Sequence, residues 1–199
     1  ELRQSGLRDS DISALARADA LQSIAGHRHQ AHWQSISISD QQMPLFANVK
    51  DQPARELPAP HESENIKADY ESTGLTLGRH PLALLRNSPE LKNCVMAKDL
   101  ITCRSGQVLT LAGLVTCRQR PGTRSGVTFL TLEDESGNSN VVVWAHTARQ
   151  FRQCFLTSNL LWVKGIVEIH EGVVHVIAGR LKDLSSLLSF SRLESRRFH

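Results

Sequence analysis

The sequence predicts an α+β chain whose first half is helical and whose second half folds as a small β-barrel. In the first half, apolar residues recur at helical spacing, and prolines interrupt the pattern between two helical stretches. From Gln107 onward, apolar residues recur at every second position in five runs, and a segment with helical spacing separates the third run from the fourth. Five strands with one helix between strands 3 and 4 are the layout of the OB-fold, a partly open five-stranded barrel.

The first half divides into three segments. Residues 1–35 form a helical N-terminal segment with short apolar stripes. Residues 36–63 contain four prolines and no apolar period, which predicts a linker because proline blocks the interior of a helix. Residues 64–104 predict a helical connector, made of a short helix, a glycine-containing turn and a second helix with Pro81 at its first position. The expected apolar face of the first helix consists of Ile12, Leu15 and Ala16.

Residues 105–188 hold the predicted barrel, and a basic tail follows at residues 189–199. The five expected strands are residues 108–120, 126–135, 139–144, 160–170 and 172–181, with a helix at 145–156. Gly113 and Gly165 lie in the middle of strands, where a barrel strand coils sharply and a side chain would obstruct it. Trp144, which ends the third strand, is expected in the core.

Positive charge concentrates in the second half of the chain. The whole chain carries 23 Lys and Arg against 20 Asp and Glu, for a formal net charge of +3. Residues 104–199 carry 12 basic against 7 acidic side chains. Any contact with a polyanion is therefore expected at the barrel rather than at the N-terminal helices.

The loop between the first two strands is the first candidate for nucleic-acid contact. It carries Arg118, Arg120 and Arg124 around a Pro-Gly turn, and in an OB-fold this loop flanks the binding groove. Three arginines so close together suit phosphate contacts, although a solvated turn is the alternative. The loop between the fourth and fifth strands holds Glu168 and Glu171, which would repel phosphates and make binding lopsided and weak.

Two strands supply aromatic candidates. Alternation places Phe129 on the outer face of the second strand, and Trp162 beside Lys164 on the outer face of the fourth. An outward aromatic ring can stack on a base while a nearby lysine neutralises a phosphate. The alternative is that Phe129 and Trp162 pack under the flanking helix or linker.

Three sequence blocks carry a family resemblance: "DYESTGLTLGRHPLALLR", "LAGLVTCRQRPGTRSGVTFLTLEDESGNSNVVVW" and "LLWVKGIVEIHEGVVHVIAGRL". In order and spacing they resemble the C-terminal part of bacterial C-family DNA polymerases, the alpha subunit of polymerase III and its error-prone relatives. Residues 2–33 are similar to the end of that family's fingers and helix-hairpin-helix region. The wording "TCRQRPGTRSGVTFLTLEDESG" favours the error-prone, damage-tolerant branch. The chain also stops soon after "LKDLSSLL", whereas replicative subunits continue into a clamp-loader-binding domain.

The resemblance implies a parent enzyme that extends a primer by nucleotidyl transfer during DNA repair, translesion synthesis and induced mutagenesis. Its Mg²⁺ ions would be held by carboxylates of a palm domain that this sequence does not include. No cofactor, metal site or catalytic residue is expected in this segment. Asp134, with Glu133 and Glu135, forms the densest acidic cluster, but it lies at a hairpin turn and is expected to have no basic or hydroxyl partner.

A peptide in the linker resembles the family's sliding-clamp motif. In "QQMPLF", Gln42, Met43, Leu45 and Phe46 match a glutamine, variable positions, then leucine and phenylalanine. Such a peptide can place its two apolar side chains in a pocket of the clamp. The alternative is a linker patch that packs against its own domain.

These observations leave three hypotheses for function. The first is an accessory region of an error-prone polymerase, or alternatively of a replicative alpha subunit, whose barrel holds single-stranded template DNA. The second is a protein-docking module for the sliding clamp or for a polymerase-like partner of the mutagenesis complex. The third is a free-standing single-strand-binding protein. The chain contains no apolar run near 18 residues and no paired C-x-x-C cysteines, so a cytoplasmic protein without membrane contact is expected.

Overall fold

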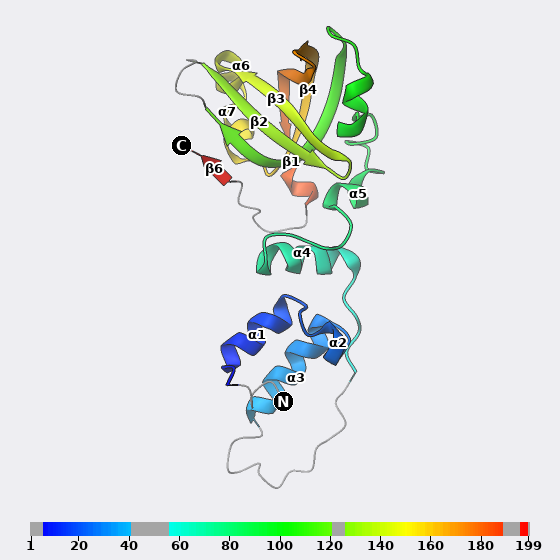
Figure 1. Ribbon diagram of the computed structural model, residues 1–199, viewed down its shortest axis with the longest axis vertical. Coiled ribbons are helices and arrows are strands. Elements are labelled where there is room, and N and C mark those ends of the chain that lie inside the picture. Colours follow the sequence, from blue (N-terminus) through cyan, green and yellow to red (C-terminus); the bar gives the residue numbers. More distant parts are fainter. Residues whose placement is uncertain (1–5, 41–55, 121–125, 189–195, 199) are drawn as a thin grey trace. The chain divides into compact units, whose positions relative to one another are not determined.

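The computed structural model of the 199-residue chain describes residues 6–40, 56–120, 126–188 and 196–198. The chain forms two compact units, residues 1–78 and residues 79–199 (Figure 1). This division falls inside the segment 64–104 that the sequence predicts as a single connector. The first connector helix belongs with the N-terminal helices, and the second belongs with the barrel.

Four helices make up the described part of the first unit: α1 (Asp9–Arg17), α2 (Gln22–Ala25), α3 (Arg28–Asp40) and α4 (Glu62–Ser72). α3 continues past residue 35, where the sequence predicts the helical segment to stop, and ends at Asp40. Ile12 and Ala16 of α1 are buried in a cluster with Leu21 and Ala31, and Leu15 packs against its edge. The predicted apolar face of the first helix is therefore confirmed.

A buried arginine joins α4 to the other helices of this unit. The Arg28 side chain is 6% exposed, and its guanidinium donates hydrogen bonds to the Asp69 carboxylate at 2.5 Å and to the Arg17 carbonyl at 3.2 Å. The Asp19 carboxylate lies 3.9 Å away. Because an unpaired buried charge is costly, this network holds α4 in place.

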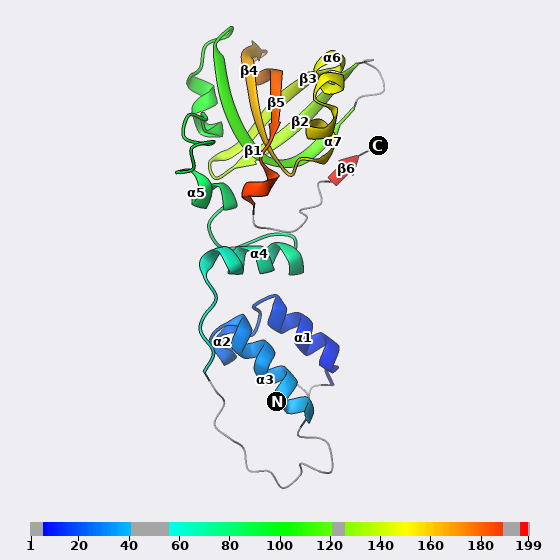
Figure 2. The same ribbon diagram turned by 180° about the vertical axis from the view of Figure 1, so that it is seen from behind.

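Five strands of the second unit close into a barrel: β1 (Val108–Gln119), β2 (Val127–Asp134), β3 (Gly137–Trp144), β4 (Leu160–His170) and β5 (Val173–Asp183). The strand order is β2-β3-β5-β4-β1, and β1 also pairs with β2 (Figures 1 and 2). β3 and β5 pair in parallel, and the other neighbouring strands of the barrel are antiparallel. The predicted five-stranded OB-fold is confirmed.

The segment between β3 and β4 is helical, as predicted, but it forms two short helices, α6 (Ala145–Gln150) and α7 (Arg152–Thr157). Ala148 of α6, Phe155 of α7 and Phe151 between the two helices pack against the barrel core. The predicted basic tail contains a further short strand, β6 (Arg196–Phe198), which pairs in parallel with the end of β1.

The barrel core is formed by inward side chains from all five strands. Its largest fully buried members include Leu111, Leu130, Leu132, Val141, Val143, Leu161, Val163, Val167 and Val176. Burying apolar side chains of this size contributes about 1.5–3 kcal/mol each. Since alternate residues of a strand face opposite sides, the core fixes which residues the barrel presents outward.

The connector packs on part of that outer surface. It contains α5 (Pro81–Leu85) and a 3₁₀ helix, η2 (Ala97–Thr102), and a second 3₁₀ helix, η3 (Ser185–Leu187), follows β5. The His80 Nδ1 atom accepts a hydrogen bond from the Leu82 backbone N–H and caps α5. A second apolar cluster joins the connector to outward residues of β1 and β4, and it contains Leu82, Leu91, Ala112, Leu114, Leu160, Leu184 and Leu188.

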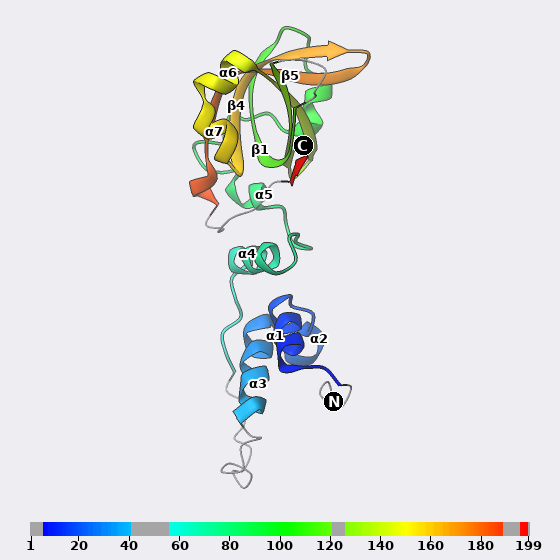
Figure 3. The same cartoon turned by 90° about the vertical axis from the view of Figure 1, so that its left-hand side faces the viewer.

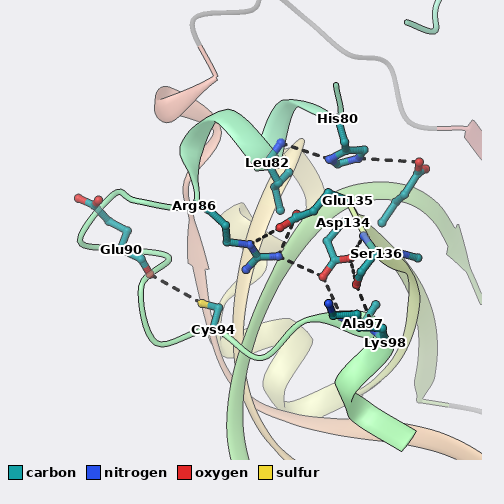
Figure 4. Close-up of polar contacts among 12 residues, drawn as sticks. His80, Leu82, Arg86, Glu90, Cys94, Ala97, Lys98, Asp134, Glu135 and Ser136 are labelled. Carbon is teal, nitrogen blue, oxygen red and sulfur yellow. Dashed lines mark hydrogen bonds and ion pairs between the residues drawn. The ribbon is translucent and has the colours of Figure 1, made fainter. Parts of the chain in front are cut away.

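An ion-pair network anchors the connector to the β2–β3 hairpin (Figure 4). The Arg86 guanidinium donates to the Glu135 carboxylate at 2.6 and 3.0 Å and to Asp134 at 3.2 Å. Asp134 also accepts hydrogen bonds from the Ala97 N–H and from the N–H and hydroxyl of Ser136. The expectation that this acidic cluster has no basic or hydroxyl partner is wrong, because Arg86 comes from a segment 48 residues away.

The environment of Asp134 favours its ionised form. Burial opposes ionisation, but the hydrogen bonds from Ser136 and Ala97 and the positive charge of Arg86 outweigh it and lower the pKa of Asp134 below its ordinary value of 3.8. Its stabilising contribution is therefore complete above that value and is lost as the pH falls through the lower pKa of the folded state.

The two mid-strand glycines lie where strands approach each other closely. A Cβ atom at Gly165 would overlap the Ile177 carbonyl oxygen, and one at Gly113 would lie 2.8 Å from the Leu132 Cβ. Register shifts occur nearby, between Lys164 and Gly165 and between Val115 and Cys117. The predicted reason for these glycines is therefore confirmed.

We expect Gly165→Ala to lower the free energy of unfolding by about 3 kcal/mol, because the new methyl group would push β4 from β5. Urea denaturation measures this effect. Gly179→Ala is the matched control, since a Cβ atom there would meet only the Lys164 carbonyl oxygen at 3.6 Å. Equal stability of the two variants would contradict the close approach at Gly165.

We expect Asp134→Asn to lower the free energy of unfolding by about 2 kcal/mol at neutral pH, because it removes the charge that Arg86 faces. The wild-type chain should lose stability more steeply than the variant as the pH falls below about 4. Asp99→Asn, at an exposed position of η2, is the control. Parallel acid-denaturation curves for wild type and Asp134→Asn would argue against this role.

Candidate nucleic-acid interface

One row of outward apolar side chains crosses all five strands of the barrel. The pairing register places these residues side by side: Phe129 of β2, Val142 of β3, Ile177 of β5, Ile166 of β4 and Val108 of β1. We call them the apolar row. Val108 is 59% exposed and Ile166 is 49% exposed, while Phe129 and Ile177 are half-buried. Val142 is buried at 8% exposure, so the row is most open at Ile166 and Val108. Its exposed side chains can contact the faces of nucleic-acid bases.

Trp144 lies next to the apolar row. It follows Val142 by two residues on β3, pairs with Val127 of β2, and is 47% exposed. The expectation that Trp144 belongs to the core is wrong, because Val141 and Val143 take the inward positions of β3. The ring is thus available as an exposed aromatic surface beside the strand that carries Phe129.

The two sides of the apolar row differ in charge. On one side, Lys164 of β4 pairs with Arg180 of β5, and both are exposed. On the other side, the register places polar residues of four strands, namely Thr131, Asn140, His175 and Glu168. Lys164 and Arg180 belong to the β4–β5 hairpin, which extends beyond the other strands (Figure 3). A phosphate backbone is therefore favoured on the lysine and arginine side.

The proposed aromatic contacts fall in two different environments. Phe129 and Lys164 lie on the outer face, as expected. Trp162 also points outward, but it packs against the second apolar cluster under the connector. Trp162 is therefore a packing residue, as in the alternative interpretation. Trp144 is the tryptophan of the barrel whose side chain is exposed.

The three candidate arginines also differ. Arg118 lies within β1 rather than in a loop, and its guanidinium donates to the backbone carbonyls of Phe155, at 3.0 Å, and of Ser158. It therefore helps to hold the end of α7 against the barrel. Arg120 is exposed, and Arg124 lies outside the described residues.

Of the two acidic residues that the sequence predicts in the loop between the fourth and fifth strands, only Glu171 lies in the turn, and Glu168 belongs to β4. Glu168 is an exposed residue near the end of β4. Glu171 occupies the turn between the two strands, with φ of +49°. Both carboxylates are therefore open to solvent, and the predicted lopsided charge of the face stays an expectation that binding experiments can check.

Other sequence-based expectations do not concern this face. The clamp-motif residues Gln42, Met43, Leu45 and Phe46 lie outside the described residues. Within the described parts of the chain, no group of three or more His, Cys, Asp or Glu side chains is placed to hold a metal ion. No helix in those parts is long and apolar enough to span a membrane. The four cysteines are half-buried free thiols.

The sequence pattern alone does not reveal most of the apolar row. It assigns Ile166, Ile177 and Val108 to strands without a role, although an apolar residue at an outward position of an alternating strand is a usable signal. Only the strand register shows that these outward positions line up. The sequence pattern does not reveal the pairing of Arg180 with Lys164 either, because the register shifts between Lys164 and Gly165.

The barrel matches a model of a known domain family. Residues 109–184 match the tRNA anti-codon family, described as an OB-fold nucleic acid binding domain. Among solved structures, an asparaginyl-tRNA synthetase from Pyrococcus horikoshii is 23% identical with a TM-score of 0.40. The likeness covers 46% of this chain and 22% of that one.

The whole chain is similar to bacterial polymerases. It is 90% identical to an error-prone DNA polymerase from Idiomarina loihiensis over 199 residues, which are 100% of this chain and 19% of that relative. It is 48% identical to an error-prone DNA polymerase from Pseudomonas fluorescens, over 98% of this chain and 19% of the relative. The chain thus spans about a fifth of the length of these relatives. Over its whole length the chain is similar to one segment of bacterial error-prone DNA polymerases, and its barrel matches the model of an OB-fold nucleic acid binding domain.

Proposed function

We propose that this chain is the part of an error-prone DNA polymerase that holds single-stranded DNA, and that the DNA lies on the open outer face of the barrel. The observation that carries the proposal is the apolar row, with exposed Trp144 at its edge and the Lys164–Arg180 pair along one side. Proteins that bind single strands without sequence preference combine these same two elements, stacking surfaces and a basic track.

The geometry suggests how a strand would be held. Neighbouring strands of a sheet lie about 4.8 Å apart, so the apolar row offers a succession of contact points for bases. Phe129 and Trp144 supply the aromatic surfaces, and Lys164 with Arg180 would face the phosphates. Glu168 on the opposite side would repel phosphates and so fix which side the backbone takes. Side chains that can hydrogen-bond base edges, such as Asn140 and His175, lie beside the apolar row rather than within it, and sequence-tolerant binding is expected.

The parent protein, in this proposal, is a DNA polymerase used in translesion synthesis, DNA repair and induced mutagenesis in the cytoplasm. The names of its relatives support the polymerase activity. The catalytic carboxylates and their Mg²⁺ ions would belong to a palm domain outside these 199 residues. This segment would keep the template strand near the enzyme while other domains perform the nucleotidyl transfer.

We expect Trp144→Ala to weaken binding of a fluorescein-labelled dT12 oligonucleotide about ten-fold, since one stacked base contributes about 1–3 kcal/mol. Phe129→Ala should act in the same direction. Fluorescence anisotropy at low salt measures both. Ile101→Ala is the control, because Ile101 is 79% exposed but belongs to η2 rather than to a strand that carries the apolar row.

Replacing Lys164 and Arg180 by glutamine should make dT12 affinity less sensitive to salt. The slope of the logarithm of affinity against the logarithm of salt concentration should fall by about 0.7 for each phosphate that the two cations neutralise. An unchanged salt slope would place the phosphates elsewhere. Absence of dT12 binding by the wild-type chain would reject the whole proposal.

A second function, docking to the sliding clamp, is favoured by one specific observation, the "QQMPLF" sequence. We propose it for Gln42, Met43, Leu45 and Phe46, and a polymerase-like partner of the mutagenesis complex remains an alternative occupant. Leu45→Ala combined with Phe46→Ala should abolish retention of the chain on immobilised clamp, because both apolar anchors are removed. Retention of this double variant at the wild-type level would count against clamp docking.

A further inference from the structure

A basic pocket lies beside α6 and α7, on a different surface from the apolar row. Its volume is about 600 Å³, which falls in the range of about 300–1,000 Å³ usual for small-molecule sites. Four arginines line it: Arg118, Arg120, Arg149 and Arg152. Its remaining described lining residues are uncharged, and the apolar ones include Ala148 and Phe155.

The arginines come from segments that the fold brings together. Arg118 belongs to β1 and donates to the carbonyls of Phe155 and Ser158, which hold its guanidinium at the pocket. Arg149 of α6 donates from Nε to the Ala145 carbonyl at 3.2 Å, and its two terminal nitrogens can turn toward a ligand. Arg152 of α7 is exposed. Because no described lining residue is acidic, the pocket has a positive potential.

The pocket also adjoins the outer face. Thr128 lines the pocket, and the next residue, Phe129, belongs to the apolar row. Ala145 lines the pocket, and the residue before it is Trp144. Thr128 and Phe129 point to opposite sides of β2, so the two surfaces meet at the end of β3, where the chain passes from Trp144 into α6. A strand that lies on the apolar row would reach the pocket by passing over the end of β3 at Trp144.

We propose that this four-arginine pocket binds the phosphate group of a nucleotide, with the sugar or base against Ala148 and Phe155. Arginine suits this role because its planar, always charged guanidinium can donate two parallel hydrogen bonds to phosphate oxygens. This proposal rests on the proposed function in one respect, because the pocket would add a phosphate contact for a strand already bound on the outer face. Its affinity for a nucleotide is nevertheless a separate property.

The test uses the full 199-residue chain and two probes, thymidine 5′-monophosphate and the labelled dT12 oligonucleotide. In NMR titrations, the monophosphate should shift the backbone amide signals of Ala148 and Phe155, and thymidine without phosphate should not. Arg149→Gln combined with Arg152→Gln should remove these shifts and weaken dT12 binding at least five-fold. The matched control is Lys98→Gln combined with Arg104→Gln, which removes the same charge at exposed positions away from the pocket.

The outcomes separate the pocket from the proposed function. If the monophosphate shifts the pocket signals in the wild type alone while dT12 fails to bind, the pocket is supported and single-strand binding fails. If dT12 binding depends on Trp144 but the pocket variant matches its control with both probes, the pocket proposal is overturned and single-strand binding stands. Should the double variant prove less stable on thermal unfolding, Arg120→Gln at an exposed position repeats the test.

Discussion

Closure of the five-stranded sheet is the constraint on which the rest of this domain depends. The β1–β2 pairing completes the barrel. Register shifts lie in the β1–β2 and β4–β5 pairings, and glycines stand at a close approach in each of them. Once the barrel is closed, the inward half of each strand is committed to the core. Only the outward half remains for ligands, so the register that closes the barrel also determines which outward side chains become neighbours. The apolar row is a product of that register.

The connector then divides the outward surface into a covered part and an open part. Arg86, Asp134 and Glu135 anchor the connector to the β2–β3 hairpin, and Leu82 and Leu91 pack on outward residues of β1 and β4. Trp162 is half-buried under this cover, whereas the row that ends at Val108 stays open. The ion pairs thus serve the interface indirectly, because they keep the connector on one region of the barrel and off another.

This division explains how far the sequence could predict the domain. Alternation of apolar residues is a local signal, and it correctly predicts the five strands, the helical segment before β4, the outward position of Phe129 and the need for Gly165. Asp134 pairs with Arg86, and Arg118 donates to the Ser158 carbonyl. These partners lie 48 and 40 residues away in the chain, so no local periodicity reveals the contacts. The prediction for Trp144 is wrong because a large aromatic residue at the end of a buried strand usually faces the core. Here Val141 and Val143 occupy the inward positions of β3.

The separation of stacking from charge bears on how a polymerase could use such a domain. In the proposed function, apolar side chains and two aromatic rings would hold bases without fixing their identity, and Lys164 with Arg180 would attract phosphates without fixing their register. A template strand must advance past its binding surface one nucleotide at a time, and contacts of this kind cost similar amounts at every step. Directional hydrogen bonds to base edges would instead hold the strand at preferred sequences. In the proposed function, the apolar row itself would let a strand move, and the acidic Glu168 on one side would keep the phosphates on the other side.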